Sequence, residues 1–541
     1  MLVSEAIGVA VGRLGIEVAF GLAGSGNFLL INAMRGAGVG YVAACHEAGA
    51  VAMADGYARV SGRVGVATVH QGPGVTNTLT ALTEAVRSHT PLLLFAAEVA
   101  GGASHRNQAL DQVPLVRAVG AGAERLTAMD DPIGVVSAAY ARARSERRPI
   151  VVILPVDLQN RPHYGDAGPP ALAPLEPAQP ATAELARADA AIRRARRPLI
   201  LAGRGAVAAG PALRELGERV GAVLTTTIVA KGLFAGDPFD AGILGGFASP
   251  LAIELAREAD LLLAFGTSLD AWTTCDGRIP VPGTPIVRVD DRGLPGATVR
   301  GDAALVAQRL SDHGAATWRT PALVERIASY RLEDGIPPSG SHMLDPRRLA
   351  VALDRALPRG RIVAVDSGHF LAFAGMYVGA RDGRGFLFAQ GFQSMGLGLG
   401  VGIGGALAGA GRVTAALLGD GGAQMSLLEL DTAIRHSLPL VVVIFNDDGY
   451  GAELHDFEPH GIPADIARFP GRDFAALARA MGAQAATVRS LDDLDVLTRW
   501  LDAPVGPLVL DCKVDPEVDA ISVMSEIGAA EWSMPAPGAL V

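Results

Sequence analysis

The chain has 541 residues, which is enough for about three domains of ordinary size. Half of its residues are hydrophobic and only 5% are aromatic, a composition that suits α/β sheets covered by closely packed helices. The formal net charge of −10 argues against nucleic acid or an anionic membrane surface as the main partner, so we expect neither.

Cysteines and apolar runs bear on where the protein works. The three cysteines are widely spaced and odd in number, which predicts neither a disulfide framework nor a zinc site and fits a reducing cytoplasm. The first residues lack a basic region ahead of an apolar core, so we expect no signal peptide. The longest uncharged apolar run, 395–411, is shorter than the about 20 residues of a bilayer span and contains several glycines. We expect a buried helix there, and a cytoplasmic location.

Strands that end in glycine-rich or polar loops organise the N-terminal part of the chain. A strand over 16–20 runs into a loop that contains Ser25, and the next strand leads into a helix of small residues that starts near Glu47. A third strand ends at His70. Each feature also has an ordinary explanation, because an acid is favourable at a helix N-terminus and a strand-end histidine can be satisfied by backbone groups. A glycine-rich loop by itself indicates any nucleotide fold, or only a turn.

Composition shifts indicate where domains end. We expect 149–155 to be the last strand of the first domain, followed by a linker over 157–180 that is rich in Pro, Gly and Ala. Strands over 199–202 and 261–265 predict a middle α/β domain, and a third domain starts near His342.

Two aspartates define an expected metal site. An apolar run ends at Asp420, an amphipathic segment follows, and Pro439 introduces a second apolar run, 440–445, before Asp447. Parallel strands joined by a helix put their carboxyl ends on one edge of the sheet, so the two aspartates should lie side by side. Hard oxygen ligands beside glycines that let backbone N–H groups approach a phosphate suit Mg²⁺ holding a diphosphate.

The spacing of this motif makes it specific. Gly-Asp-Gly, followed 27 residues after its Asp by Asp447 in Asn-Asp-Asp-Gly-Tyr-Gly, resembles the cofactor signature of the thiamine diphosphate-dependent enzymes. That family includes acetolactate synthase, pyruvate decarboxylase and benzoylformate decarboxylase. The resemblance implies that Mg²⁺ is held by Asp420, Asp447 and the main-chain carbonyl of Gly449. The family has Asn where this chain has Asp447, a change that adds negative charge without removing an oxygen ligand.

The N-terminal motifs resemble the same family. His46-Glu47 followed by Ala-Asp-Gly-Tyr-Ala matches the segment of its catalytic glutamate, which hydrogen-bonds the cofactor's pyrimidine ring from the partner subunit and helps C2 lose its proton. Ser25 and His70 match residues of the benzoylformate decarboxylase site, which implies that His70 transfers a proton. Gln108 matches a glutamine of acetolactate synthases that faces the reacting centre.

Further residues are implied only by the resemblance. Glu453 lines up with a pyruvate decarboxylase glutamate that donates a proton or repels a substrate carboxylate, although an exposed acid in a loop would also explain it. Met395 takes the place of the large apolar side chain under the bent cofactor, a bend that brings the pyrimidine amino group to C2. The expected cofactor-binding residues are Ser25, Pro73, Asn77, Ser367, Gly368, His369, Gln393, Met395, Gly421, Gly422, Tyr450 and Gly451.

The resemblance covers essentially the whole chain and implies three doubly wound α/β domains with mostly parallel sheets. These are a pyrimidine-binding domain over 1–165, a central domain over 182–315 and a domain over 342–520 that binds the diphosphate and magnesium, followed by a tail over 521–541. FAD binds the central domain in acetolactate synthases, but its usual Arg-Phe-Asp-Asp element is replaced here, so FAD is possible and not favoured. Sites in this family form between subunits, which implies a homo-oligomer.

The implied reaction begins with a 2-oxo acid that loses CO₂. Capture of the remaining fragment by a second carbonyl compound would make an acetolactate synthase-like carboligase, which is our first expectation. Its protonation would make a simple decarboxylase like benzoylformate decarboxylase, and cleavage of a diketone is a third possibility. A non-catalytic relative that only binds the cofactor is a further alternative, against which the intact Glu47 speaks.

Overall fold

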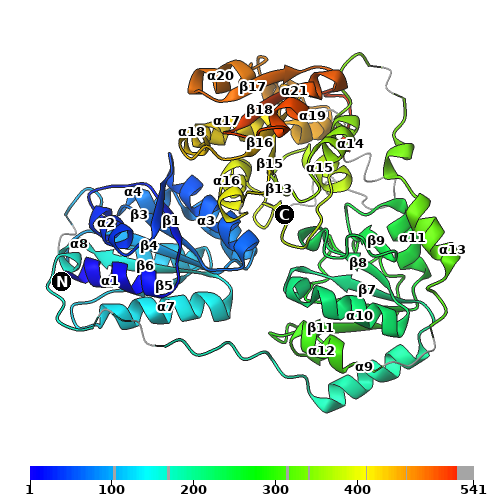
Figure 1. The fold of residues 1–541 in the computed structure, drawn as a ribbon, viewed down its shortest axis with the longest axis horizontal. Helices are drawn as coiled ribbons and strands as arrows, with labels where there is room; N and C mark the ends of the chain where they lie inside the picture. Colours follow the sequence, from blue (N-terminus) through cyan, green and yellow to red (C-terminus); the bar gives the residue numbers. More distant parts are fainter. Residues whose placement is uncertain are drawn as a thin grey trace.

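The computed structural model describes residues 1–101, 105–166, 168, 171–311, 316–338, 341–409, 411–457 and 460–520. It contains three domains, each with one sheet of six parallel strands covered by helices (Figure 1). This confirms the expected fold class. The expected tail, 521–541, lies outside the described residues. No helix among the described residues is long and apolar enough to span a bilayer.

The N-terminal domain has the strand order β2-β1-β3-β4-β6-β5. Its central strands are buried along their whole length because helices cover both faces of the sheet. The strands are β1 Val18–Gly21, β2 Gly40–Ala43, β3 Gly65–Val69, β4 Leu92–Glu98, β5 Gly122–Arg125 and β6 Pro149–Pro155. The helices are α1 Val3–Arg13, α2 Phe28–Gly36, α3 Glu47–Ser61, α4 Pro73–Thr76, α5 Leu79–Arg87, α6 Gln112–Ala118, α7 Pro132–Glu146 and α8 Val156–Gln159.

The central domain, drawn in green in Figure 1, has the order β12-β11-β10-β7-β8-β9. Its strands are β7 Pro198–Ala202, β8 Val223–Thr226, β9 Asp240–Ile243, β10 Leu261–Phe265, β11 Ile286–Asp290 and β12 Val299–Arg300. Its helices are α9 Thr182–Arg194, η1 Arg204–Ala209, α10 Gly210–Val220, η2 Ile228–Ala230, α11 Pro250–Glu258, α12 Ala303–Arg309, α13 Pro321–Ser329 and η3 Leu332–Gly335.

The C-terminal domain has the order β14-β13-β15-β16-β18-β17. Its strands are β13 Ile362–Val365, β14 Phe386–Phe388, β15 Thr414–Gly419, β16 Leu440–Asn446, β17 Gln484–Val488 and β18 Leu508–Lys513. Its helices are α14 Pro346–Ala356, α15 Leu371–Tyr377, α16 Gly398–Ala408, α17 Asp420–Ser426, η4 Leu427–Glu429, α18 Leu430–Arg435, α19 Gly451–Phe457, η6 Ala464–Ala467, α20 Phe474–Met481, η7 Leu491–Leu494 and α21 Asp495–Leu501.

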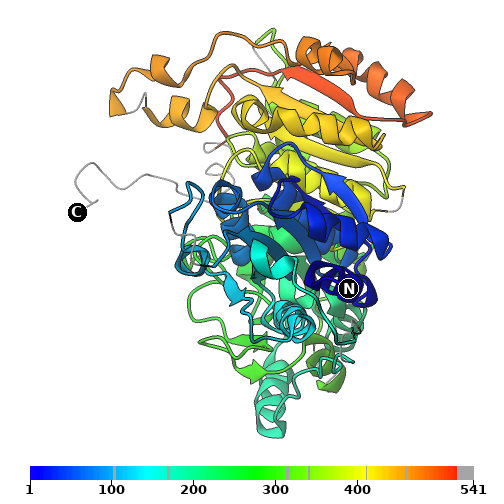
Figure 2. The ribbon, with the colours of Figure 1, turned by 90° about the vertical axis from the view of Figure 1, so that its left-hand side faces the viewer.

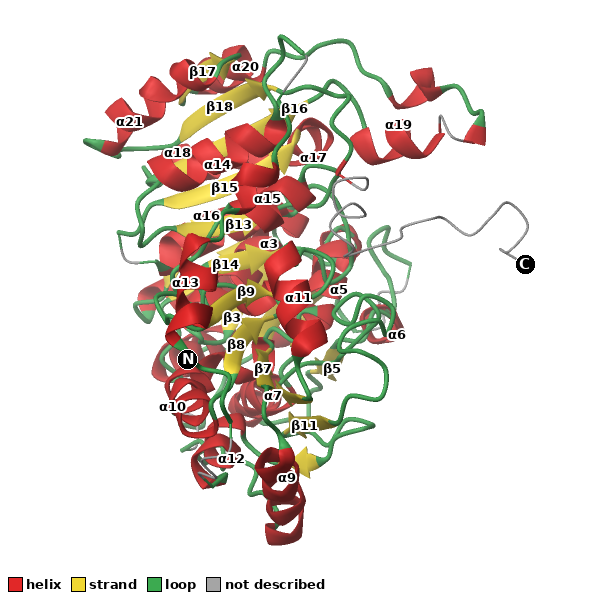
Figure 3. Cartoon of the chain, turned by 90° about the vertical axis from the view of Figure 1, so that its right-hand side faces the viewer, coloured by secondary structure: helices red, strands yellow, loops and turns green. Residues whose placement is uncertain are grey.

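The strand-helix-strand unit expected around the two aspartates is present. β15 pairs in parallel with β16, and α17, η4 and α18 form the crossover (Figure 3). The apolar run that we expected to be a buried helix is α16, which is buried from Gly398 to Ala406.

Helices α3 and α16 join the N-terminal and C-terminal domains by packing directly on each other (Figures 1 and 2). Glycines make this close approach possible. A Cβ on Gly56 would lie 2.1 Å from the carbonyl oxygen of Val401, and one on Gly404 would lie 1.9 Å from that of Met53. A single hydrophobic core therefore runs from one sheet through this helix pair to the other.

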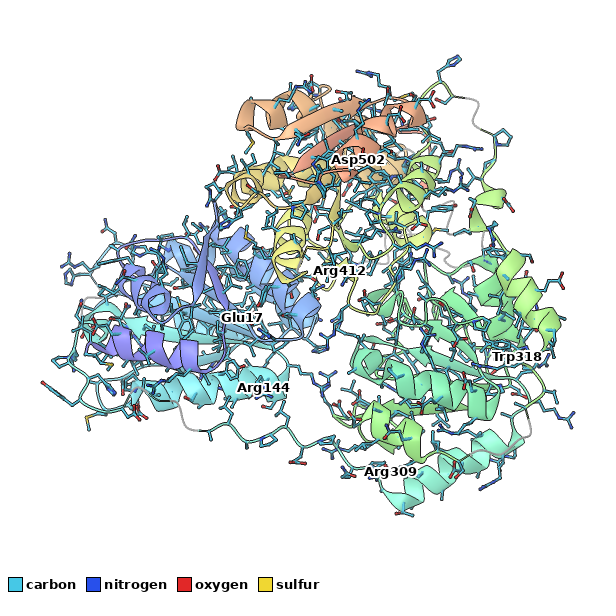
Figure 4. All side chains as sticks on the ribbon, in the orientation of Figure 1. Glu17, Arg144, Arg309, Trp318, Arg412 and Asp502 are labelled. Carbon is cyan, nitrogen blue, oxygen red and sulfur yellow. The ribbon has the colours of Figure 1, made fainter. Side chains whose placement is uncertain are left out.

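At the lower edge of the C-terminal domain, Arg412 lies near the centre of the molecule (Figure 4). Its guanidinium donates to the carbonyls of Gly360 and Arg361 and pairs with Asp382 at 2.7 Å. These contacts fasten the chain that leads into β13, whose carboxyl end carries candidate site residues.

Candidate active site

Glu47 is the first residue of α3, which begins after the extended residue His46. The Nδ1 atom of His46 accepts a hydrogen bond from the N–H of Ala48 at 3.1 Å. The Glu47 side chain is buried, with 7% exposed, and Asn77 donates from Nδ2 to its Oε2 at 3.0 Å. The structure thus brings together two residues that the sequence assigned to the pyrimidine side of the site.

His70 follows β3, and both of its ring nitrogens have partners. The N–H of Gly26 donates to Nδ1 at 3.0 Å, so Nδ1 carries no proton. The proton of the neutral ring is therefore on Nε2, which lies 3.1 Å from Oε1 of Gln108 and donates to it. Gln71 donates to the same Oε1 at 3.0 Å. The described residues offer no partner to Nε2 of Gln108, which remains available as a donor.

Two glycines allow the loops around His70 to pack this closely. Gly26 has no room for a side chain, because a Cβ there would lie 2.0 Å from Oε1 of Gln71. Gly72 has φ +61 and a Cβ on it would lie 2.6 Å from the carbonyl oxygen of Gln108. Ser25 is exposed in the loop next to Gly26, and Pro73 is the first residue of α4. The expected N-terminal site residues therefore line one edge of the sheet.

Asp420 and Asp447 follow the neighbouring strands β15 and β16. Asp420 is the first residue of α17 and accepts the N–H groups of Gly421 at 2.8 Å and Gly449 at 3.1 Å. Burial, and next the charge of Asp447, raise the pKa of Asp420 to about 8. Burial also raises the pKa of Asp447. Two buried carboxyl groups that resist ionisation together are suited to a divalent cation, and hard oxygen ligands fit Mg²⁺.

The loops after β13 and β14 form the part of the site expected to receive the diphosphate. Ser367 donates from Oγ to Oε1 of Gln390 at 3.2 Å and to the carbonyl of Gln393 at 3.3 Å. Nε2 of Gln390 is buried without a partner among the described residues. An unpaired buried donor in this position fits an anionic phosphate group.

Glycines line the same surface. A Cβ on Gly422 would lie 2.3 Å from Oδ2 of Asp366, and one on Gly451 would lie 2.6 Å from Oδ2 of Asp447. The latter would also lie 3.0 Å from Nδ1 of His369, so His369 and Asp447 lie on the same side of Gly451. Gly368 has φ +138, a conformation that favours glycine. Gly422 and Gly451 therefore allow the loops at this surface to pack closely on one another.

The remaining expected residues lie near this surface in different settings. Gln393 has a left-handed backbone with φ +59, and Met395 is half-buried in the same loop. The ring of Tyr450 lies against Gly421, where a Cβ would approach it to 2.6 Å. Glu453 is exposed on the first turn of α19, so its setting is compatible with both explanations of this residue.

Sequence reasoning named His369 but missed the residues that the fold brings to it. His455 and Asp519 offer ligand atoms within 4.8 Å of that of His369, and the N–H of Ala520 donates to Nε2 of His369 at 2.9 Å. Gln390 was missed as well. No local motif reveals these contacts, because their members come from loops up to 151 residues apart.

Within the described part of one chain, no hydrogen bond links Glu47, His70 or Gln108 to Asp420 or Asp447. We refer to Glu47, His70 and Gln108 as the N-terminal half-site and to Asp420 and Asp447 as the C-terminal half-site.

Family models of thiamine pyrophosphate enzymes match all three domains. The N-terminal TPP binding domain matches residues 1–117, the central domain 185–309 and the C-terminal TPP binding domain 366–512. These matches cover more than half of the chain. The protein belongs to the family of thiamine pyrophosphate enzymes.

Curated relatives resemble the chain over nearly its whole length. The protein named "Probable 2-ketoarginine decarboxylase AruI" of Pseudomonas aeruginosa is 33% identical over 91% of this chain and 90% of its own. A sulfoacetaldehyde acetyltransferase of Castellaniella defragrans is 28% identical over 94% of this chain and 91% of its own. An acetolactate synthase large subunit of Parasynechococcus marenigrum is 28% identical, with 93% and 86% covered. The names of the relatives thus include a probable decarboxylase, an acetyltransferase and an acetolactate synthase subunit.

Proposed function

We propose that this protein is a thiamine diphosphate- and Mg²⁺-dependent enzyme that decarboxylates a 2-oxo acid and releases the product after protonation. The hydrogen bonding of His70 carries this proposal. Because the N–H of Gly26 occupies Nδ1, the ring presents a proton on Nε2. An N–H donor in this position can hold a water molecule beside the decarboxylated fragment, which favours protonation of the fragment over its capture.

The residues that would hold the metal and the diphosphate come from the C-terminal domain. Asp420, Asp447 and the carbonyl of Gly449 would hold Mg²⁺, while Ser367 and Gln390 would face the diphosphate. When bound, thiamine diphosphate supplies an electron sink for the electron pair that is released as CO₂ leaves.

Side chains of the N-terminal domain would take part in the proton transfers. Asn77 holds Oε2 of Glu47, which leaves Oε1 to exchange a proton with a ring nitrogen of the pyrimidine. A water molecule bound by the Nε2–H of His70 would give its proton to the substrate carbon, and the hydroxide that results would be neutralised by solvent. Oε1 of Gln108 holds the Nε2–H in place beforehand. The burial of Glu47 excludes water from this exchange.

Carboligation is the second candidate, and Gln108 favours it. Its Oε1 accepts from His70 and Gln71, so its amide Nε2 can donate to the oxygen of an acceptor carbonyl. The names of the acetyltransferase and acetolactate synthase relatives agree with a transfer reaction.

A substrate panel separates these candidates. The purified protein is incubated with thiamine diphosphate, Mg²⁺ and either 2-ketoarginine, pyruvate or benzoylformate, with and without an acceptor aldehyde, and CO₂ and products are recorded. CO₂ with free aldehyde would support the decarboxylase. A 2-hydroxyketone or a 2-hydroxy-2-oxo acid would make the protein a carboligase. The absence of turnover with every donor would overturn the proposal in favour of diketone cleavage or a non-catalytic role.

A further inference from the structure

A buried cluster of charged side chains lies at the end of α3 that is remote from Glu47. Arg59 donates from Nε to Oδ1 of Asp55 at 3.0 Å and from Nη2 to Oε1 of Glu84 at 2.9 Å. The side chains of Asp55 and Glu84 are 1% and 2% exposed. Burial opposes the ionisation of Glu84, but Arg59 and the other donors around it hold its pKa below the usual range. The cluster is therefore charged and held within the protein.

Two hydrogen bonds connect this cluster to the backbone of the C-terminal domain. Nη1 of Arg59 donates to the carbonyl of Phe388 at 2.9 Å, and the N–H of Phe392 donates to Oε2 of Glu84 at 2.7 Å. Phe388 is the last residue of β14, and Phe392 lies in the loop 389–396 that follows. That loop carries Gln390 and Met395.

Side-chain packing does not hold the centre of this loop. Gly391, Phe392 and Gln393 are exposed, and the side chain of Phe392 is 47% exposed. Gln393 also has the left-handed φ of +59, which is unfavourable for a residue with a side chain. The loop therefore depends on its backbone bonds. At its end the N–H of Gly396 donates to the buried Asp366, and at its exposed centre the bond from Phe392 to the buried Glu84 is charge-assisted.

The central domain reaches the same carboxylate. Arg204 donates from Nη1 to the carbonyl of Ser88, and Oγ of Ser88 donates to Oε1 of Glu84 at 2.8 Å. Glu84 thus lies where hydrogen-bonded groups of all three domains meet.

We propose that Glu84, with Arg59, is a positioning residue that holds the loop 389–396 in the shape required to bind thiamine diphosphate. This inference rests on the proposed function, since that function assigns the loop to the cofactor. The geometry explains why a carboxylate is needed. One oxygen accepts from Arg59 and Ser88 while the other accepts from Phe392, and an amide has only one accepting atom.

The test compares the full-length wild type with Glu84→Gln and with Asp345→Asn as a matched control. Asp345 is also a buried carboxylate paired with an arginine, Arg347, but it caps α14 and does not contact the loop. We expect Glu84→Gln to raise the Kd for thiamine diphosphate in the presence of Mg²⁺ about tenfold, as measured by isothermal titration. Asp345→Asn should lower stability without changing this Kd.

Hydrogen–deuterium exchange of the protein without cofactor gives an independent readout. Residues 389–396 should exchange faster in Glu84→Gln and at the wild-type rate in Asp345→Asn. Unchanged exchange in Glu84→Gln, or an unchanged Kd together with lower stability, would overturn the inference. If the wild type binds no thiamine diphosphate but residues 389–396 still exchange faster in Glu84→Gln, the proposed function is wrong. In that case the role of Glu84 in holding this loop is still supported. If Glu84→Gln does not fold, Arg59→Lys is measured in its place. Lysine lacks the second guanidinium nitrogen, which in Arg59 donates to the carbonyl of Phe388.

Discussion

His70 and Glu47 are each held in place by a hydrogen bond to one polar atom, and Gln108 orients the second ring nitrogen of His70 as well. Nδ1 of His70 accepts from Gly26 and Oε2 of Glu47 accepts from Asn77. These hydrogen bonds fix the orientation of both side chains, so neither needs to reorganise before a proton moves. At the scale of single residues, the fold therefore supplies preorganisation.

Replacement of Glu47 tests this arrangement most directly. Glu47→Gln keeps the shape of the side chain and removes the exchangeable proton, so we expect turnover to fall by about 10²–10⁴-fold while the fold and the affinity for Mg²⁺ persist. Turnover with the best 2-oxo acid and titration of Mg²⁺-thiamine diphosphate measure the two quantities. Full turnover in this variant would refute the assignment of Glu47.

At the scale of elements, α3 does three tasks. It begins at Glu47, it packs through glycines on α16, and near its end it carries Asp55 and Arg59, before Gly62 ends it with φ +72. Its small residues are therefore required by the helix that it packs against as well as by the sheet of its own domain.

The glycine contact predicts a sharp stability difference between two Gly→Ala substitutions. In Gly404→Ala the Cβ meets a backbone carbonyl that cannot move without separating the helices, so we expect a loss of about 3 kcal/mol or more in the free energy of unfolding. Gly36→Ala in α2 meets nothing within 4 Å and should be neutral or stabilise by about 0.5 kcal/mol. Urea denaturation measures both, and equal midpoints for the two variants would contradict the packing argument.

Motifs at strand ends could be predicted from the sequence because a local pattern marks them. The positions of Asp420 and Asp447 after two strands were predicted in this way, as was the helix that begins at Glu47. The helical crossover between the two parallel strands was predicted as well. The hydrogen bond from Phe392 to Glu84 could not be predicted, because the two residues are 308 positions apart and no sequence pattern links them. The tautomer of His70 likewise depends on Gly26, which another loop supplies.

At the scale of the whole molecule, the half-sites pose a question of assembly. We propose that Glu47 of one copy works with Asp420 and Asp447 of a second copy, as the resemblance to enzymes whose sites form between subunits implies. A homo-oligomer with two copies of the site would follow from such an exchange.

Mixing two inactive variants tests this assembly. Glu47→Gln and Asp420→Asn chains should each be inactive, but a hybrid dimer contains one site with both residues intact. Unfolding and refolding an equimolar mixture should restore about a quarter of the wild-type activity by random pairing. Each variant refolded alone is the control. The two variants carry different affinity tags, so that hybrids can be recovered by purification on both tags in turn. Hybrids recovered in this way that remain inactive would place both half-sites in one chain.

The junction of the central and C-terminal domains predicts a pH dependence of stability. Lys231, which follows η2, donates from Nζ to the carbonyl of Gly375 in α15 at 2.5 Å, and burial lowers its pKa to about 7. Between pH 7 and the ordinary lysine pKa the unfolded chain binds more protons than the folded one. The free energy of unfolding therefore rises with pH in that window. It decreases again as the pH is lowered towards 7, because the unfolded chain takes up the proton first.

A comparison with Lys231→Met isolates this effect. The free energy of unfolding of the wild type, relative to the variant, should increase by about 2 kcal/mol from pH 7 to pH 9. Denaturant titrations at the two pH values measure it. Parallel pH profiles for the two proteins would show that Lys231 stays protonated throughout.

The glycine-lined contact between α3 and α16 also constrains the synthesis of the protein. Helix α3 ends at Ser61 and its partner is complete only at Ala408, so roughly 350 residues must be added while the packing face of α3 has no partner. At about 5–20 residues per second the ribosome needs on the order of 20–70 s for this stretch. During that time the nascent N-terminal domain presents an apolar helix face to the cell, which makes it a substrate for chaperones that bind such faces until α16 emerges.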